Sequence, residues 1–220
     1  MVDIKYIGHS AFQITNGDKA VLIDPFIKGN RNYDWRKQPL KDILLTHAHG
    51  DHLGQAIEIA RELNIEITAI PELAAYCREK GARAKSVNLG AWINYSWGRA
   101  IFLPAYHSSS LPDGRYGGCP ASILLDFNGA RIYHAGDTCL TSEMKTIKEL
   151  YSPQYAMLPI GGNYTMDIEH AAIAAKWLGV KTVIPMHYNT FPEIKADVEK
   201  FTKLIGENNI SVGILKPDDV

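Results

Sequence analysis

The stretch of residues 46–52, with the sequence THAHGDH, contains four side chains of the types that bind divalent metal ions: His47, His49, Asp51 and His52. The run KDILL before it predicts a buried strand, and the run LGQAIEIAR after it predicts a helix. The four side chains therefore fall on a strand-to-helix turn, at the C-terminal end of a strand, where α/β sheets place their chemistry. The sequence predicts a metal site at this turn.

The spacing of these side chains favours two metal positions rather than one. Residues two apart in an extended backbone point the same way, so we expect His47 and His49 to bind one ion together. Asp51 and His52 come after the turn, so they face a neighbouring position. Four ligands alone would fill a single tetrahedral site and leave no position open for catalysis.

Three further candidate ligands each follow a strand-like run: His107, Asp137 and His187. Strands that end at one rim of the sheets would bring these side chains together with the first four. Seven ligands are too many for one ion, and they suit two ions that share a carboxylate. Imidazole and carboxylate ligands accept Zn, Mn, Fe or Ni, and the set contains no thiolate.

The order of these residues along the chain resembles the metallo-β-lactamase superfamily. The matching elements are the stretch 46–52, His107, the triplet Gly136-Asp137-Thr138 and His187. Four further segments resemble a branch of metal-dependent hydrolases: GHS at 8–10, IDP at 23–25, LPIGGNYTM at 158–166 and MHYNTFP at 186–192. That branch neighbours the ascorbate-6-phosphate lactonases and the N-acyl-phosphatidylethanolamine phospholipase D type.

The resemblance implies an α/β fold, a four-layer αββα sandwich of two mixed sheets with helices on both outer faces. It implies three ligand assignments: His47, His49 and His107 for the first ion, Asp51, His52 and His187 for the second, and Asp137 as the bridge. Asp24 would orient one of these ligands, as carboxylates behind metal-bound histidines do. His170 departs from the branch, in which we expect an acidic residue near that position.

Length and composition fit this interpretation. The 220 residues favour one domain that spans 1–220, and 46% hydrophobic with 21% charged residues is typical of a soluble globular protein. The formal net charge of −1 predicts no nucleic-acid partner and no attraction to anionic lipid. Neither a run of 18 apolar residues nor a signal-peptide pattern is present, so we expect a cytoplasmic protein without a membrane partner.

Hydrophobic periodicity predicts two halves, each with strands first and helices after, which favours two packed sheets with helices outside. The first half contains predicted strands at 4–7, 11–14, 20–23, 43–46, 65–70 and 84–89, with helices at 53–63 and 71–80. The second contains strands at 100–106, 123–127, 131–134, 155–160, 181–186 and 210–215, with helices at 141–151, 168–178 and 193–207. Asn16-Gly17 and Asn128-Gly129 predict hairpin turns. The loop 27–39 holds Tyr33 and Trp35, and we interpret it as a pocket wall or lid.

Other polar side chains are candidates for proton transfer or substrate binding. The catalytic candidates are Asp51, His9, His134 and His170, and the substrate-binding candidates are Asn163, Asn189 and Tyr164. For His9 and His134 a structural role and a catalytic role both remain open.

The predicted function is a dinuclear hydrolase, in which a hydroxide that bridges two divalent ions cleaves a small ester, lactone or phosphate-containing metabolite. One alternative is an RNA-processing enzyme or another phosphodiesterase of the same superfamily, although the sequence lacks a basic patch. A second alternative is a metal-holding binding module without turnover. A di-iron protein that reduces oxygen or nitric oxide is disfavoured, because such proteins carry an acidic residue where His49 stands and have a flavin domain.

Overall fold

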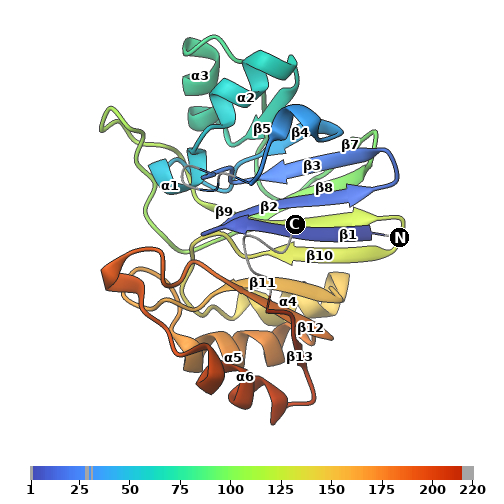
Figure 1. Ribbon diagram of the computed structural model, residues 1–220, viewed down its shortest axis with the longest axis vertical. Coiled ribbons are helices and arrows are strands. Elements are labelled where there is room, and N and C mark those ends of the chain that lie inside the picture. Colours follow the sequence, from blue (N-terminus) through green and yellow to red (C-terminus); the bar gives the residue numbers. More distant parts are fainter. Residues whose placement is uncertain (1, 28–29, 31, 215–220) are drawn as a thin grey trace.

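The strands of the protein form two mixed sheets, seen in a computed structural model that describes residues 2–27, 30 and 32–214 (Figure 1). The first sheet has the order β1-β2-β3-β4-β5-β6, with strands Val2–Gly8, Ala11–Asn16, Lys19–Ile23, Leu40–Leu44, Glu66–Ala69 and Ala84–Ser86. The second has the order β13-β12-β11-β10-β9-β8-β7. From β7 to β13 its strands are Trp92–Tyr95, Gly98–Pro104, Ala121–Phe127, Ala130–His134, Tyr155–Pro159, Thr182–Met186 and Ser211–Val212.

Helices cover the outer face of each sheet. Helices α2 (Ala56–Leu63) and α3 (Pro71–Glu79) pack against β4, β5 and β6. Helix α5 (Ile168–Leu178) lies against both α4 (Glu143–Tyr151) and α6 (Val198–Gly206), and it contacts β11 while α6 contacts β13. The two helical groups stand at opposite ends of the long axis with the sheets between them (Figure 1). The predicted four-layer αββα sandwich is confirmed.

Alternation along single strands explains why both faces of a sheet are apolar. In and after β4, Ile43 and Leu45 pack in the cluster that includes Ile59 of α2. Leu44, between them, packs in the other cluster, which joins the two sheets. Successive side chains of a strand point to opposite faces, so one apolar run serves two layers.

Both predicted hairpins are present, and the turn of one consists of the predicted residues. Phe127 pairs with Ala130, so Asn128 and Gly129 form a two-residue turn with φ values of 54° and 101°. Positive φ at both positions is the type I′ geometry that favours Asn-Gly. In the other hairpin Asn16 is the last residue of β2 and pairs with Lys19, so the turn consists of Gly17 and Asp18 and not of the predicted Asn16 and Gly17.

The structure divides two predicted helices and contains one strand that was not predicted. The predicted helix 53–63 divides into α1 (Gly50–Leu53) and α2, because Gly54 ends α1 with φ 45°. The predicted helix 193–207 divides into the 3-10 turn η2 (Pro192–Ile194) and α6. Strand β7 was not predicted, and the last residue of the predicted strand 210–215 lies outside the described residues.

The loop 27–39 packs against the protein rather than forming a free flap in the part that the structure describes. Tyr33 is buried, and its hydroxyl donates a hydrogen bond to Oε1 of Gln13 at 2.8 Å. Trp35 begins a 3-10 turn, η1 (Trp35–Lys37), and packs against the cluster beneath α2 and α3. These contacts contradict the interpretation of Tyr33 as part of a lid, because its ring belongs to the core.

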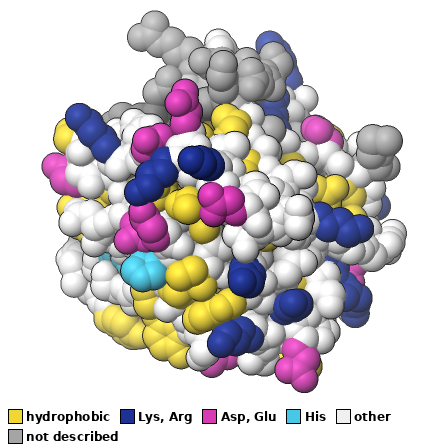
Figure 2. Space-filling view, turned by 90° about the horizontal axis from the view of Figure 1, so that it is seen from below, with side chains coloured by type: hydrophobic (Ala, Val, Ile, Leu, Met, Phe, Trp, Pro, Cys, Tyr) yellow, Lys and Arg dark blue, Asp and Glu magenta, His cyan; other side chains and the backbone are white. Residues whose placement is uncertain are grey.

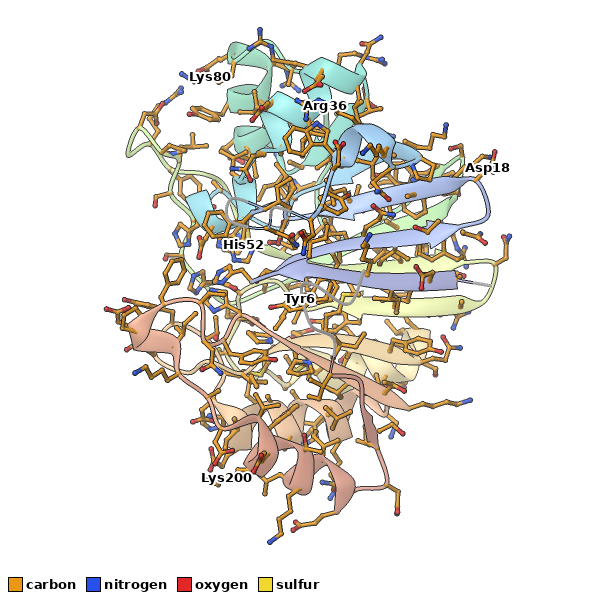
Figure 3. All side chains as sticks on the ribbon, viewed as in Figure 1. Tyr6, Asp18, Arg36, His52, Lys80 and Lys200 are labelled. Atoms are coloured by element: carbon orange, nitrogen blue, oxygen red, sulfur yellow. The ribbon has the colours of Figure 1, made fainter. Side chains whose placement is uncertain are left out.

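The surface carries both charge signs. Figure 2 shows basic and acidic side chains intermingled on one face, and on α5 and α6 Glu169 pairs with Lys200 at 2.6 Å. In the described part of the chain, no helix is both long enough and apolar enough to span a lipid bilayer. His52 lies where the two halves of the sandwich meet, at the other end of the strands from Asp18 (Figure 3).

Candidate metal centre

The turn that follows β4 is held in place by the segment that follows β3. His49 has an extended backbone (φ −61°, ψ 148°) and immediately precedes α1. A side chain at Gly54, which ends α1, would overlap the backbone carbonyl of Pro25. The backbone N–H of Gln55 also donates to the carbonyl of Pro25 at 2.9 Å. The close packing therefore requires glycine at position 54 and fixes α1 beside Asp24.

The first donor group consists of His47, His49 and His107, which come from this turn and from the segment after β8. Their ligand atoms all lie within 4.8 Å of one another. Nε2 of His47 is 3.0 Å from Nδ1 of His49. Burial lowers the pKa of His47 well below its ordinary value, and it also lowers the pKa of His49 and His107. Neutral imidazole is the form of histidine that binds metal ions.

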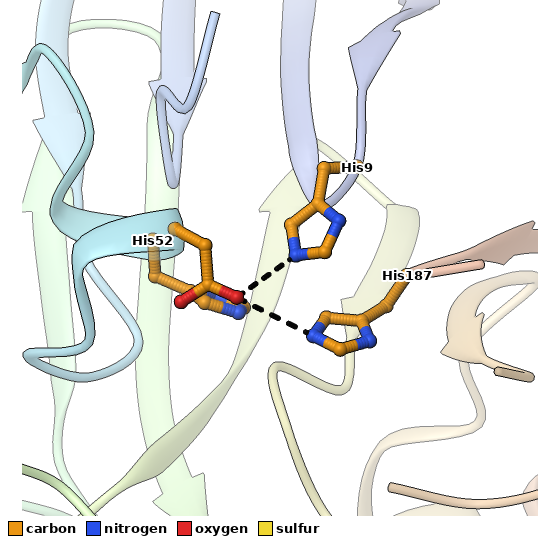
Figure 4. Close-up of side chains that lie close together, drawn as sticks. His9, His52 and His187 are labelled. Atoms are coloured by element: carbon orange, nitrogen blue, oxygen red, sulfur yellow. Dashed lines mark hydrogen bonds and ion pairs between the residues drawn. The ribbon is translucent and has the colours of Figure 1, made fainter. Parts of the chain in front are cut away.

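The second donor group consists of His9, Asp51, His52 and His187, and its ligand atoms also lie within 4.8 Å of one another. Oδ2 of Asp51 is 3.0 Å from Nε2 of His9 and 3.7 Å from Nε2 of His187, as the dashed lines in Figure 4 mark. Burial raises the pKa of Asp51, but the neighbouring His187 and His9 outweigh this effect and hold the pKa far below its ordinary value. Asp51 is therefore a carboxylate, able to act as a ligand.

Asp137 lies between the two donor groups. Its Oδ2 is 3.2 Å from Nε2 of His187, 3.5 Å from Nε2 of His107 and 4.0 Å from Nε2 of His47. Its Oδ1 is 3.2 Å from Nε2 of His52. The side chain is almost fully buried, and the neighbouring His52 and His187 lower its pKa well below its ordinary value despite that burial. The structure thus brings the seven predicted ligands together, with the carboxylate of Asp137 between the two donor groups.

The arrangement fits bound metal ions, because buried ligand atoms at its centre have no hydrogen-bond partner. Three such atoms face the centre among the described residues: Nε2 of His52, Oδ1 of Asp137 and Nε2 of His187. A buried polar atom without a partner is costly, and native proteins rarely leave several together. A cation at this position would satisfy all three atoms.

Asp24 orients His52 and the turn, as predicted. One of its oxygens accepts the backbone N–H of Thr46 at 2.8 Å. The other accepts the Thr46 hydroxyl at 2.6 Å and lies 2.7 Å from Nδ1 of His52. Because Nδ1 donates to this carboxylate, Nε2 of His52 is left to face Asp137. Asp24 itself has φ 44°, a left-handed backbone that its side-chain bonds hold in place.

His9 reaches the second donor group from the turn between β1 and β2. The ring is buried, with Nε2 facing Asp51 and Nδ1 2.6 Å from the hydroxyl of Thr190. If Nε2 carries the proton and donates to Asp51, Nδ1 accepts the hydroxyl proton of Thr190. Thr190 was not among the predicted site residues, because nothing in its residue type signals the contact.

His134 is fully buried, and backbone groups engage both of its ring nitrogens. Nδ1 accepts the N–H of Gly136 at 3.1 Å, so Nε2 carries the proton and donates to the carbonyl of Ser10 at 3.0 Å. These bonds tie the end of β10 to the turn that carries His9. The geometry supports a positioning role for His134 instead of the predicted catalytic role.

The other predicted residues lie outside the donor groups. His170, in the first turn of α5, is exposed, and its Nδ1 is 3.0 Å from Asp167. The side-chain amide of Asn189 donates to the carbonyl of Ala196 and accepts its N–H, so these bonds occupy it within its own loop. Both contacts disfavour the predicted roles of His170 in catalysis and Asn189 in substrate binding. Asn163 and Tyr164 are exposed in the loop after β11.

Comparisons with known proteins agree with this geometry. A family model described as a beta-lactamase superfamily domain matches residues 3–187. A UPF0173 metal-dependent hydrolase from Thermus thermophilus is 40% identical over 222 residues, covering 100% of this chain and 98% of the relative. One from Staphylothermus marinus is 44% identical over 229 residues with the same coverage.

A solved structure extends the agreement to three dimensions. A metallo hydrolase from Ignicoccus hospitalis has a TM-score of 0.90 and 36% identity, covering 98% of this chain and 95% of its own. The family match, the two relatives and this structure cover nearly the whole chain. The protein therefore belongs to the metallo-β-lactamase superfamily and is one of its metal-dependent hydrolases.

Proposed function

We propose that the protein is a dinuclear metal-dependent hydrolase that cleaves a small ester, lactone or phosphate-containing metabolite. Two sets of side chains would hold the ions: His47, His49 and His107 for the first, and Asp51, His52 and His187 for the second. Asp137 would contact both ions.

The position of Asp137 carries this proposal. Its two oxygens approach histidines of both donor groups at 3.2 to 4.0 Å, and its neighbours keep it ionised. Burying a carboxylate among four imidazoles costs free energy of folding unless cations bind at the same site. A single ion would leave one donor group without a cation.

The chain's own residues account for the remaining requirements of hydrolysis. When bound, the two ions would supply an activated water and polarise the oxygen of the scissile group. Asp137 would contact both ions and offset part of their charge. Asp24 holds His52 in the tautomer that binds through Nε2, and His9 holds the carboxylate of Asp51.

The ligand types favour zinc, with manganese, iron or nickel as alternatives, because imidazole and carboxylate suit all four metals. The formal net charge of −1 and the intermingled surface charges favour a small-molecule substrate over a nucleic acid. Asn163 and Tyr164, both exposed, remain candidates for substrate contact.

Elemental analysis combined with a panel of probes tests the proposal. We expect protein purified without chelator to contain about two divalent ions per chain. It should hydrolyse p-nitrophenyl esters or bis-p-nitrophenyl phosphate, and the activity should disappear with EDTA and return with metal. Two ions without turnover on any probe would favour the binding module, and cleavage confined to single-stranded RNA would favour the nuclease.

A further inference from the structure

An exposed aromatic side chain stands directly beside the second donor group. Phe191 is 39% exposed, and its ring meets the ring of His9 edge-on with centroids 5.2 Å apart. The ring of Phe26 is 5.6 Å from that of His9 and 6.4 Å from that of Phe191. Since His9 bonds to Asp51, only one imidazole separates the two phenyl rings from the metal ligands.

The exposure of Phe191 is a fixed feature of its loop. The preceding residue, Thr190, contacts Nδ1 of His9 at 2.6 Å. Asn189 donates its backbone N–H to the carbonyl of Ile194 at 2.8 Å, and Ile194 is fully buried. The side-chain amide of Asn189 donates a hydrogen bond to the backbone carbonyl of Ala196 and accepts one from its backbone N–H. These bonds hold Phe191 at the surface, where an apolar ring gains by being covered.

Space for a ligand group adjoins this ring. Residues 189–192 and 195–197 line a surface hollow of about 630 Å³. Small-molecule sites are commonly of this size and combine apolar walls with a few polar groups that fix orientation. Here the apolar wall includes Phe191, the polar lining includes Lys195 and Asp197, and Thr190 lines the same hollow and contacts His9 of the second donor group.

We propose that Phe26 and Phe191 form a hydrophobic subsite beside the second donor group, and that the substrate carries an alkyl or aryl group next to its scissile bond. This inference rests on the proposed function, because the metal centre would hold the reacting group while the phenyl rings cover its apolar substituent. It narrows the substrate class to esters, lactones or phosphate-containing compounds with an apolar substituent.

Binding of phosphonates tests the subsite without requiring turnover. On metal-loaded protein, calorimetric titration should show that phenylphosphonate binds more tightly than methylphosphonate, by about 10-fold. F191A should remove most of this preference, and F191L should retain it. As a matched control, L150A removes another exposed apolar side chain, from α4, and should leave the preference unchanged.

The outcomes separate the subsite from the proposed function. Equal affinity for the two phosphonates, a preference that survives in F191A, or binding of neither compound would overturn the subsite, even where esters are hydrolysed. Preference for phenylphosphonate that F191A abolishes would support the subsite, even if no ester is hydrolysed and the hydrolase proposal fails. With turnover, F191A should lower the ratio of kcat/KM for p-nitrophenyl hexanoate over acetate by about 10-fold.

Discussion

The two donor groups differ in how firmly the protein holds them. In the first, His49 and His107 are only partly buried, and no carboxylate among the described residues bonds to their outer nitrogens. In the second, Asp24 bonds to His52, and His9 joins Asp51 to Thr190. The second group also contains a carboxylate of its own. We therefore infer that the second position binds its ion more tightly, because outer partners fix ligand orientation and raise ligand basicity.

The largest expected effect comes from removing the carboxylate that both groups share. D137A should lose at least about 10³-fold in kcat, since a bound metal contributes several kcal/mol of charge stabilisation. The variant should also bind about one ion fewer per chain while its melting temperature stays close to that of the parent. Elemental analysis, steady-state kinetics and circular dichroism measure the three quantities. Retained full activity would contradict the bridging role.

The difference between the groups should largely disappear in D24N. This change keeps the size of the side chain but weakens its bond to Nδ1 of His52. Affinity for the second ion should fall by about 10- to 100-fold, with little change at the first. Competition with a chromophoric chelator measures both affinities, and equal losses at the two positions would argue against selective support by Asp24.

H9A should cause a smaller loss of affinity for the second ion. His9 supports Asp51, and the other ligands of that ion, Asp137, His52 and His187, remain. We expect about a 10-fold loss of second-ion affinity. H170A is the matched control, since His170 is exposed and contacts Asp167 rather than the centre. If H9A leaves metal affinity unchanged but lowers kcat, His9 acts on the substrate rather than on Asp51.

The smallest expected effect is the release of a proton when the metal binds. Burial lowers the pKa of His52, but Asp137 and Asp24 outweigh it and raise this pKa well above 6.5 in the metal-free protein. Without metal, His52 therefore keeps its proton to a higher pH than an ordinary histidine, and metal binding must displace that proton. Affinity should rise with pH, and calorimetry in buffers of different ionisation enthalpy should detect release of about one proton from this residue. D24N should release less, because it removes one of the groups that raise the pKa.

The sequence predicted most where residues of metal-binding type stand at the ends of segments with strand periodicity. The seven candidate ligands followed from residue type, from the compact stretch 46–52 and from their places at strand ends, and they meet in one cluster. The two sheets followed from strands and helices that recur in the same order in each half.

Other features depend on contacts that no local pattern reveals. Gly54 divides the predicted helix 53–63 because Pro25, from a different strand end, lies against it. His9 and His134 have the same residue type, yet one faces Asp51 and the other bonds only to backbone. Their roles depend on whether the side chain at the strand end points toward the metal centre. That direction is known only once the two sheets are assembled.

Anomalous diffraction from crystals of the metal-reconstituted protein tests the central claim most directly, because it places each ion relative to Asp137. The account predicts two peaks on either side of this carboxylate. One should lie among His47, His49 and His107, and the other among Asp51, His52 and His187. A single peak at full metal loading, or two peaks that both lie on one side of Asp137, would contradict it.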